Sequence, residues 1–452
     1  MNKRQAFLVA SMCYIIFFSV LNGTMFNVAL PALSKEFSLS PSGVSWVVVI
    51  YSLIFAVGSV TYGKLADIYP IRRLIVIGLL LFSSGSLIGF LSEEYWMVII
   101  ARMIQGSGSA AIPALAMIAS ARYFPIEQRG YVMGFVASTV AFGFGVGPLL
   151  GGAITQIFDW RVLFLVSVCS LAALPVLIRA LPHEEPQGGS LDILGAVLFG
   201  LGVAALLLGV NTNVWFLLLG VLLFVSFSLH IRGKEQPFIQ IGLFQNPKFV
   251  LMLLFALCIY FSHMSSFFVL PLVLADVNGL EPGWIGLVFF PGAMIAALLG
   301  TRAGKLSDRY GSQVVLRWAA IMMAMGFLTI SSLISVSVMW ISVTLIFIFL
   351  GFSSIQASLA SYIASTLDPK ETGVGLGLYN LTAFMGGTLG PTLVSKFLEL
   401  NTTRWNILNP GGFASYSNGM LILSMICLGS LLLLTGVLIL EKYHSILLRA
   451  SR

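Results

Sequence analysis

Long runs of apolar residues, separated by short polar gaps, follow one another along almost the whole chain. A helix rises about 1.5 Å per residue, so about 20 apolar residues in a row cross the hydrocarbon layer of a membrane. The runs are continuous, whereas the strands of a membrane β-barrel would alternate over about ten residues. The pattern predicts fourteen spanning helices, at residues 6–31, 44–66, 74–92, 97–119, 130–157, 161–180, 192–211, 214–231, 248–275, 282–302, 314–334, 338–363, 372–398 and 417–440.

The composition agrees with a protein whose main solvent is lipid. Of the 452 residues, 58% are hydrophobic and 9% are charged, whereas a soluble domain has about 25% charged residues. The four cysteines, Cys13, Cys169, Cys258 and Cys427, lie in apolar runs without C-x-x-C spacing. Neither a disulfide framework nor a metal site is therefore expected. The expected fold class is an all-α polytopic membrane protein.

The positions of lysine and arginine predict the orientation of the chain. There are 24 of them against 17 acidic residues, and the net charge is +7. Only four fall in the loops on one side of the predicted membrane: Lys35, Arg161, Lys396 and Arg404. Because basic loops stay on the cytoplasmic side, both termini are expected in the cytoplasm. The first run lacks the cleavage site of a signal peptide, and the basic residues form no nucleic-acid motif.

A short motif occurs twice, each time between two predicted spans. Residues Gly63–Asp67 read G-K-L-A-D, and residues Gly304–Asp308 read G-K-L-S-D. The repeat predicts two equivalent six-helix bundles, at residues 1–180 and 232–452, with a linker and two additional central helices at 181–231. Repeated halves are typical of secondary transporters, whose substrate site lies between the halves near the middle of the membrane.

The first copy of this motif resembles the loop between the second and third spans in the major facilitator superfamily. The chain as a whole resembles the fourteen-span drug:proton antiporters of that superfamily. The resemblance implies the major-facilitator fold, with these loops holding the halves together when the cavity opens outward. Asp67 is expected to cap the third helix and to meet a cation. The expected gating residues are Gly63, Asp67, Arg72 and Arg73 in the first loop and Gly304, Asp308 and Arg309 in the second.

Arg102 lies within the predicted fourth span, in the sequence R-M-I-Q-G-S-G-S. An arginine in hydrocarbon is unfavourable unless it faces the protein interior or water. It resembles the buried arginine of the superfamily, which implies a part in proton transfer. The alternative is a side chain that extends along the helix to the outer membrane surface.

The fifth predicted span carries a glycine-rich stretch. Gly143, Gly147 and Gly151 recur every four residues, which leaves one helix face bare for close packing. Pro148 removes a backbone hydrogen bond and is expected to kink this helix. With Gly152, these residues resemble the motif that marks antiporters in the superfamily, which favours export over uptake. A plain packing face is the alternative.

The first predicted span resembles the family pattern L-D-x-T-I-V-N-V-A-L-P over residues 21–31. Asn22 stands where many members have aspartate. Asn22 and Asn27 either line the substrate cavity or form hydrogen bonds between helices. Together with Gln105 and Asn380, they are the candidates for substrate-cavity residues.

A proton carrier is harder to identify, because no acidic residue lies clearly in the middle of a predicted span. The fourteen-span tetracycline exporters, which the chain also resembles, carry a glutamate in an S-E-G-T-G context where this chain has Gly386. His263 is a titratable mid-span residue whose ordinary pKa suits proton transfer, although it could equally hydrogen-bond between helices. The proton-coupling candidates are Arg102, His263 and Asp67.

The resemblance implies a secondary transporter that exports drugs or other small amphiphilic compounds by proton antiport. The alternative within the same fold is a transporter for a lipid or an endogenous metabolite, and a sensor without transport activity is a third possibility. A membrane enzyme would need a catalytic cluster, and His183, Glu184 and Glu185 lack metal-ligand spacing. We expect no catalytic residues and no cofactor, and a monomer in the bacterial inner membrane whose partners are the substrate, protons and the bilayer.

Overall fold

The computed structural model describes residues 3–39, 41–185, 192–211, 213–232, 234, 237–239, 242–280, 282–335, 337–368, 371–398, 403–407, 409 and 412–450. All regular secondary structure in these residues is helical. The elements are α1 (Lys3–Glu36), α2 (Pro41–Ala66), α3 (Ile71–Phe90), α4 (Tyr95–Tyr123), α5 (Ile126–Ile157), α6 (Val162–Val168), the 3-10 helix η1 (Cys169–Ala173), α7 (Leu174–Ala180), α8 (Ile193–Asn211), α9 (Val214–Ile231), α10 (Gly242–Gln245), α11 (Pro247–Asp276), α12 (Pro282–Tyr310), α13 (Ser312–Leu333), α14 (Val338–Thr366), α15 (Thr372–Leu398) and α16 (Ala414–Ala450).

In the described part of the chain, 12 helical segments are long and apolar enough to cross a membrane. Helices also occupy the other two predicted ranges, but they are not among the 12. α8 offers a shorter apolar stretch, Ile193–Leu206, and α15 is rich in glycine and threonine. The chain is thus an all-helical multi-pass membrane protein with about twelve candidate spans, and the number fourteen stays a prediction.

The predicted sixth span, residues 161–180, is not a single α-helix. It consists of α6, η1 and α7 in direct succession. Pro175 lies in the first turn of α7 and has no backbone N–H to donate to the turn before it. In an unbroken α-helix, the carbonyl of Leu171 would have no N–H donor at Pro175. The tighter η1 turn, Cys169–Ala173, includes this carbonyl.

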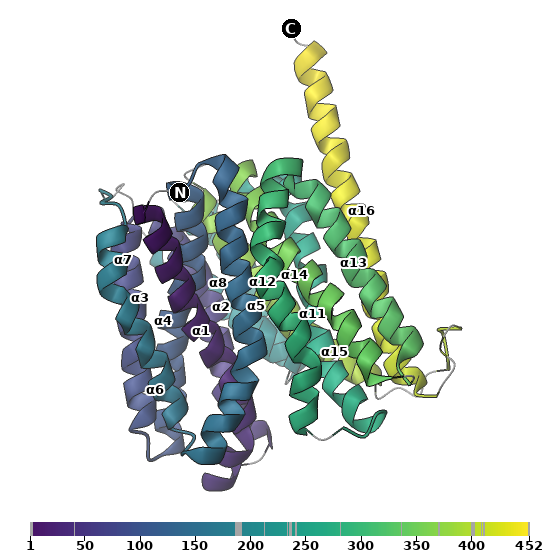
Figure 1. The fold of residues 1–452 in the computed structure, drawn as a ribbon. Helices are drawn as coiled ribbons and strands as arrows, with labels where there is room; N and C mark the ends of the chain where they lie inside the picture. Colours follow the sequence, from purple (N-terminus) through teal and green to yellow (C-terminus); the bar gives the residue numbers. More distant parts are fainter. Residues whose placement is uncertain are drawn as a thin grey trace.

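The spanning helices form two groups that lie side by side (Figure 1). Helices α1–α7 contact mainly one another, as do α11–α16. α5 also packs against α14, but the groups meet mainly along two long contacts, α5 with α12 and α2 with α15. In each contact, the second span of one predicted bundle packs against the fifth span of the other. The domain boundaries at 1–180, 181–231 and 232–452 stay a prediction.

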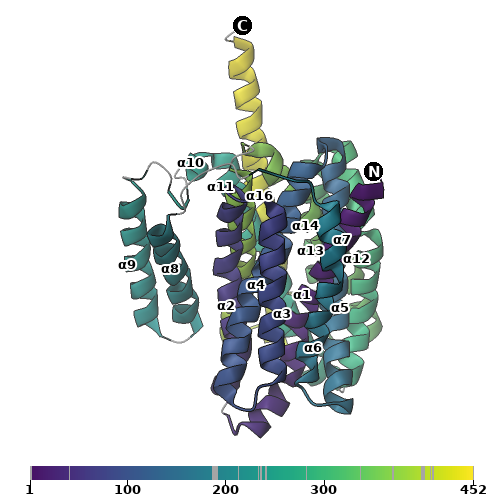
Figure 2. The same cartoon turned by 90° about the vertical axis from the view of Figure 1, so that its left-hand side faces the viewer.

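Helices α8 and α9 form a hairpin that stands beside the two groups (Figure 2). Asp192, just before α8, accepts hydrogen bonds from the backbone of Gly195 at 3.0 Å and of Phe238 at 3.3 Å. Nε2 of His230, in the last turn of α9, lies 2.8 Å from the same carboxylate. Burial raises the pKa of Asp192, but these hydrogen bonds outweigh it and leave the pKa below its ordinary value. The charged carboxylate thus links the start of α8 to the end of α9 and to the segment around Phe238.

Both ends of the described chain lie at the same end of the molecule (Figure 1). We call this end, which also carries residues 67–70 and Gly311, the basic end, and the opposite one the far end. The charge pattern predicts that the basic end faces the cytoplasm, and this orientation stays a prediction.

Candidate functional site

At the basic end, α2 and α15 meet through glycines. A Cβ atom on Gly63 would lie 2.5 Å from the carbonyl oxygen of Gly373, and one on Gly377 would lie 3.0 Å from Cα of Val60. Side chains at these positions would force the two backbones apart. The α2–α15 contact is therefore closed in this structure.

The contact between α5 and α12 has the same construction. A Cβ on Gly130 would lie 2.7 Å from the carbonyl oxygen of Gly304, and one on Gly134 would lie 2.8 Å from that of Gly300. Asp308 accepts hydrogen bonds from the backbone N–H of Gly130 at 2.8 Å and of the following residue at 2.9 Å. We call the α2–α15 and α5–α12 contacts together the basic-end gate.

Asp67 plays the equivalent part in the α2–α15 contact. The backbone of Val374 and Gly373, at the start of α15, hydrogen-bonds its carboxylate. Nη2 of Arg122 lies 2.9 Å from Oδ1. The N-cap position of α3 is Pro70, without a side-chain cap. The prediction that Asp67 caps the third helix is wrong, because the carboxylate turns to a helix of the other group, whereas the predicted cation is present.

The closed gate changes the titration of Asp67. Burial raises the pKa of its carboxyl from 3.8 to about 7, although Arg122, Lys64 and the backbone of α15 act in the opposite direction. An aspartate in water titrates near pH 3.9. Closing the α2–α15 contact thus favours protonation of Asp67 between about pH 4 and pH 7.

The remaining predicted gating residues surround these contacts. Arg72 is half-buried, whereas Arg73 and Arg309 are exposed. The guanidinium of Arg309 lies 5.3 Å from the ring of Tyr310. Among the residues that the structure describes, none of these three arginines forms an ion pair. Their predicted part in gating stays a prediction.

The glycine motif of α5 packs within the first group. A Cβ on Gly143 would lie 2.8 Å from Cγ1 of Val20, and one on Gly151 would lie 2.7 Å from the carbonyl oxygen of Met25. Gly147, between them on α5, faces Thr24 of α1, the helix that also carries Val20 and Met25. The bare face therefore packs against α1. Gly152 is half-buried, and Pro148 lies within α5. The link to antiport stays a prediction.

Arg102 is fully buried in the first group, with none of its surface exposed. Its Nε donates to the carbonyl of Val47 at 2.9 Å, and its Nη1 donates to Asn22 at 2.7 Å and to Gln105 at 3.1 Å. The guanidinium is also 4.1 Å from the ring centroid of Tyr51. Interior hydrogen bonds hold Arg102, so it does not extend to the membrane surface.

This network has no acidic member among the described residues. Asn22 donates onward to Ser167 at 2.7 Å, and Gln105 donates to Ser86 at 2.7 Å. Nη2 of Arg102 is buried and has no hydrogen-bond partner in the described part of the chain. Asn22 and Gln105 thus bind Arg102 inside the bundle, while the side chain of Asn27 is exposed.

His263 lies in the second group, enclosed by phenylalanines. Its ring stacks on Phe352 at 3.6 Å between centroids, and Phe267 and Phe349 meet it edge-on at 5.1 and 5.5 Å. Only 1% of the residue is exposed. No carboxylate contacts the ring within the described residues, so a relay to an acid is not visible there.

Next to His263, three polar side chains form a chain of hydrogen bonds between helices. The hydroxyl oxygen of Tyr260 on α11 lies 3.1 Å from the hydroxyl oxygen of Tyr379 on α15. The amide nitrogen of Gln356 on α14 donates to the same Tyr260 hydroxyl at 3.0 Å. Several buried polar atoms nearby on these helices and on α5 lack a partner among the described residues: Nδ1 of His263, Oε1 of Gln356, Nδ2 of Asn380, and Oγ of Ser138 and Ser353. Buried polar atoms are normally satisfied, so water or a polar ligand is the expected partner of these atoms.

Aromatic rings of the two groups meet around these polar atoms. The ring centroids of Phe55 on α2 and Phe384 on α15 are 4.3 Å apart, and those of Phe144 on α5 and Phe267 on α11 are 6.0 Å apart. We call these polar and aromatic residues the central cluster. Its members are Phe55, Ser138, Phe144, Tyr260, His263, Phe267, Ser353, Gln356, Tyr379, Asn380 and Phe384. It lies between the basic-end gate and the far end, where the two groups touch, and its described residues include no acid.

The proton-coupling candidate His263 and the cavity candidate Asn380 both belong to this cluster, and their predicted roles stay predictions. Sequence reasoning missed Tyr260, Gln356 and Tyr379. It also missed the glycines that face the gate motifs. Gly130 and Gly134 have the same four-residue spacing as Gly373 and Gly377, and each pair opens the fifth span of its bundle. Comparing the two bundles beyond the G-K-L motif would have found them.

Comparisons with known proteins agree with this architecture. The family model described as Major Facilitator Superfamily matches residues 12–391. The human organic anion transporter MFSD10 (TETRAN) has a similar fold, with a TM-score of 0.72 over 96% of this chain and 100% of the other. Its sequence identity is 16%, so that likeness concerns the fold.

Two curated bacterial proteins resemble the chain over most of its length. The riboflavin transporter RibZ of Clostridioides difficile (strain 630) is 26% identical over 409 residues, which cover 89% of this chain and 90% of RibZ. The multidrug resistance protein Stp of Mycobacterium tuberculosis (strain CDC 1551 / Oshkosh) is 26% identical over 420 residues, covering 88% of this chain and 76% of Stp.

Proposed function

Because the chain belongs to the major facilitator superfamily, whose members are transporters and not enzymes, we propose that it exports small, uncharged aromatic or amphiphilic compounds by alternating access. The observation that carries the proposal is the central cluster. It combines aromatic rings with buried polar atoms that have no hydrogen-bond partner among the described residues, and it lies behind a closed basic-end gate.

The gate supports the alternating-access part of the proposal. The two contacts use glycine pairs and one aspartate each, at equivalent positions of the two groups. The described cysteines are free, so no disulfide joins the two groups at these contacts. If both contacts separated, the central cluster would open to the basic end. When the gate is closed, a bound substrate could leave only at the far end.

The chemistry of the cluster supports an uncharged substrate. A buried carboxylate would favour a cationic compound, and the described cluster has only hydroxyl, amide and imidazole groups. A planar compound could stack on the phenylalanines while its polar atoms satisfy Gln356 and Asn380. The similarity to a multidrug resistance protein agrees with export.

Proton coupling forms a second part of the proposal, with Asp67 as the residue that takes up the proton. Its raised pKa belongs to the closed gate, so proton binding and gate closure favour each other. Arg102 and His263 stay candidates for this role. We further propose fourteen spans, a monomer and a bacterial inner membrane with the basic end in the cytoplasm.

Transport into proteoliposomes with an imposed pH gradient tests the proposal. The panel should contain uncharged aromatic drugs, cationic drugs and phospholipids, with proton movement recorded in parallel. We expect proton movement with uncharged aromatics only. Tyr260→Phe should raise the substrate concentration for half-maximal transport about tenfold, since it removes a hydrogen bond in a desolvated site. Tyr14→Phe, at an exposed site, should leave it unchanged.

A second candidate function is transport of an endogenous metabolite. The observation that favours it is the similarity to a riboflavin transporter over 90% of that protein's length. Riboflavin should therefore be part of the panel. Saturable riboflavin movement without competition from the drugs would favour this function over drug export.

A further inference from the structure

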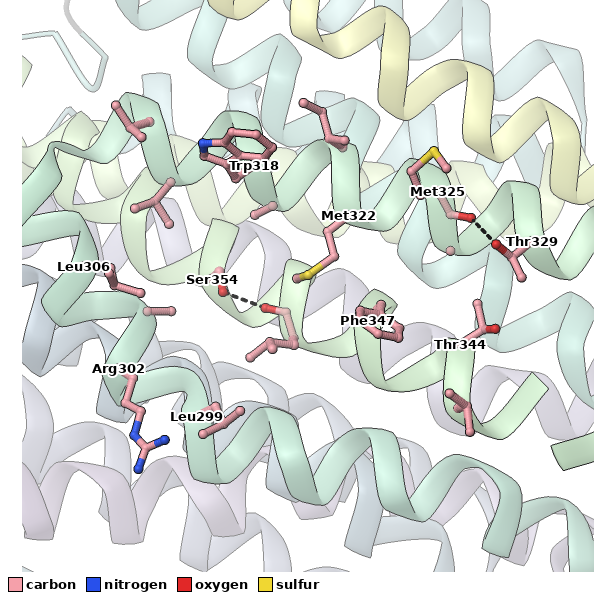
Figure 3. A pocket seen from close by; sticks show the side chains of 18 of the residues that line it. Leu299, Arg302, Leu306, Trp318, Met322, Met325, Thr329, Thr344, Phe347 and Ser354 are labelled. Carbon is pink, nitrogen blue, oxygen red and sulfur yellow. Dashed lines mark hydrogen bonds between the residues drawn. The ribbon is translucent and has the colours of Figure 1, made fainter. Parts of the chain in front are cut away.

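A groove on the surface of the second group runs between α12, α13 and α14 (Figure 3). Its volume is about 1050 Å³, near the upper end of the usual range for ligand sites, about 1,000 Å³. Apolar side chains form most of its wall, among them Leu299, Met322, Met325 and Phe347. The groove lies away from the central cluster, on a different face of these helices.

The groove opens outward rather than toward the other group. Trp318, Trp340 and Phe347 line it and are 70%, 55% and 50% exposed. In a membrane protein, such a surface faces lipid. The α13 part of the lining extends from Val314 to Thr329, which is about 22 Å at about 1.5 Å per residue. This exceeds one leaflet, which is half of a hydrocarbon layer of roughly 30 Å.

One cationic side chain, Arg302 of α12, belongs to the lining. It is exposed, and no hydrogen bond, ion pair or ring contact joins it to any described residue. Arg302 is the last residue of the predicted span 282–302, and α12 continues beyond it to Tyr310, which also belongs to the lining. An arginine at the end of a span lies at the level of the lipid headgroups, where a phosphate can meet its charge.

The rest of α12 adds positive charge on the same side. Lys305 and Arg309 lie three and seven residues after Arg302, close to one helix face. Both are engaged, since Lys305 lies 4.4 Å from the ring of Tyr131 and Arg309 lies 5.3 Å from that of Tyr310. The described groove lining contains no acidic residue. Arg302 is thus left to meet an anion from outside the chain.

We propose that the groove binds one anionic phospholipid from the leaflet at the basic end. The guanidinium of Arg302 holds the phosphate, because its planar donors match phosphate oxygens in pairs. One acyl chain lies along Met322, Met325 and Phe347 toward the far end, as the labelled side chains in Figure 3 are arranged. A second copy of the chain is a poorer occupant, because it would bury Arg302 against an apolar surface.

Native mass spectrometry of the full-length protein tests this site. The purified protein is mixed with dioleoyl phosphatidylglycerol or, separately, with dioleoyl phosphatidylcholine. We expect one retained phosphatidylglycerol per chain and about tenfold weaker retention of phosphatidylcholine. Arg302→Gln should weaken phosphatidylglycerol retention about tenfold, since it removes a charge-assisted contact. Arg179→Gln, an exposed arginine in the last turn of α7, is the matched control and should retain the lipid.

A second variant tests the acyl-chain part. Met322→Trp fills the groove and should release the lipid while Arg302 remains. Size-exclusion profiles and thermal unfolding check that each variant is folded. Equal retention of both lipids, equal loss in Arg302→Gln and Arg179→Gln, or a dimer in place of a lipid-bound monomer would each overturn the proposal.

Discussion

At the scale of single residues, Asp67 is the group whose protonation depends on the gate. Its pKa is about 7 in the closed gate and should return toward about 3.9 when the carboxylate reaches water. Because the closed gate binds this proton more tightly than the open gate, protonation of Asp67 stabilises the closed gate. The stabilisation is fully present below about pH 4 and is lost as the pH rises through about 7. Acid pH therefore favours the closed gate.

The first prediction follows from this sign. In a cysteine-free background, Ser353→Cys places one thiol in the central cluster. Because only the thiolate reacts, its labelling rate is divided at each pH by that of a free thiol with the same reagent. With the reagent added on the side of the basic end, this ratio should fall as the pH falls from 8 to 5. Asp67→Asn, which cannot ionise, should remove this pH dependence. A dependence that persists in Asp67→Asn would exclude Asp67 as the titrating group.

Arg102 is the second residue whose environment allows a quantitative prediction. Removing its side chain leaves the carbonyl oxygens of Asn22 and Gln105 without their donor, and each such loss costs about 1–3 kcal/mol. The double-mutant cycle of Arg102→Ala and Asn22→Ala should give a coupling of about 0.5–3 kcal/mol in the free energy of unfolding. This is measured by denaturant titration in mixed micelles.

Asn27→Ala is the matched control on the same helix, because the side chain of Asn27 is exposed. Its free energy of unfolding should change by less than about 0.5 kcal/mol. Independent effects of Arg102→Ala and Asn22→Ala would mean that their 2.7 Å hydrogen bond does not contribute to stability.

At the scale of helices, closure depends on bare backbone at the two contacts of the gate. Gly304→Val adds a side chain where α12 touches the backbone of Gly130, so the gate should no longer close. The initial transport rate in proteoliposomes should fall at least about tenfold. Gly429→Val is the control, since nothing lies within 4 Å of a Cβ at Gly429 of α16. Equal rates for the two variants would contradict the role of the contact.

The helices were the part of the fold that the sequence predicted best. An apolar run of about 20 residues has one stable form in lipid, so a helix lies at every predicted range. The division of 161–180 at Pro175 was missed, because the apolar run continues through the proline and the prediction followed hydropathy alone. The extension of α1 to Glu36 was missed, because the hydropathy pattern marks the hydrocarbon layer and not the helix end.

The candidate site was only partly predictable, because its contacts join residues far apart in the chain. The motif around Asp67 was visible, but its partner Gly373 lies on a helix of the other group. Likewise, nothing local to Tyr260 indicates that Tyr379 and Gln356 will meet it. Arg102 was recognised from its place in an apolar run, whereas its three acceptors needed the packed bundle.

At the scale of the whole molecule, the central claim is that two helix groups move against each other around the central cluster. Distances between spin labels test it most directly. One pair, at Tyr69 and Tyr310, lies at the basic end on different groups, and the other, at Trp96 and Met339, lies at the far end. All four side chains are exposed, so labels should not disturb packing.

The distances are measured by double electron–electron resonance in lipid nanodiscs at pH 5 and pH 8, with and without a transported compound. The account predicts a short basic-end distance at pH 5, and at pH 8 a second, longer population that appears together with a shorter far-end distance. Basic-end and far-end distances that lengthen together, or that stay fixed under all conditions, would contradict it.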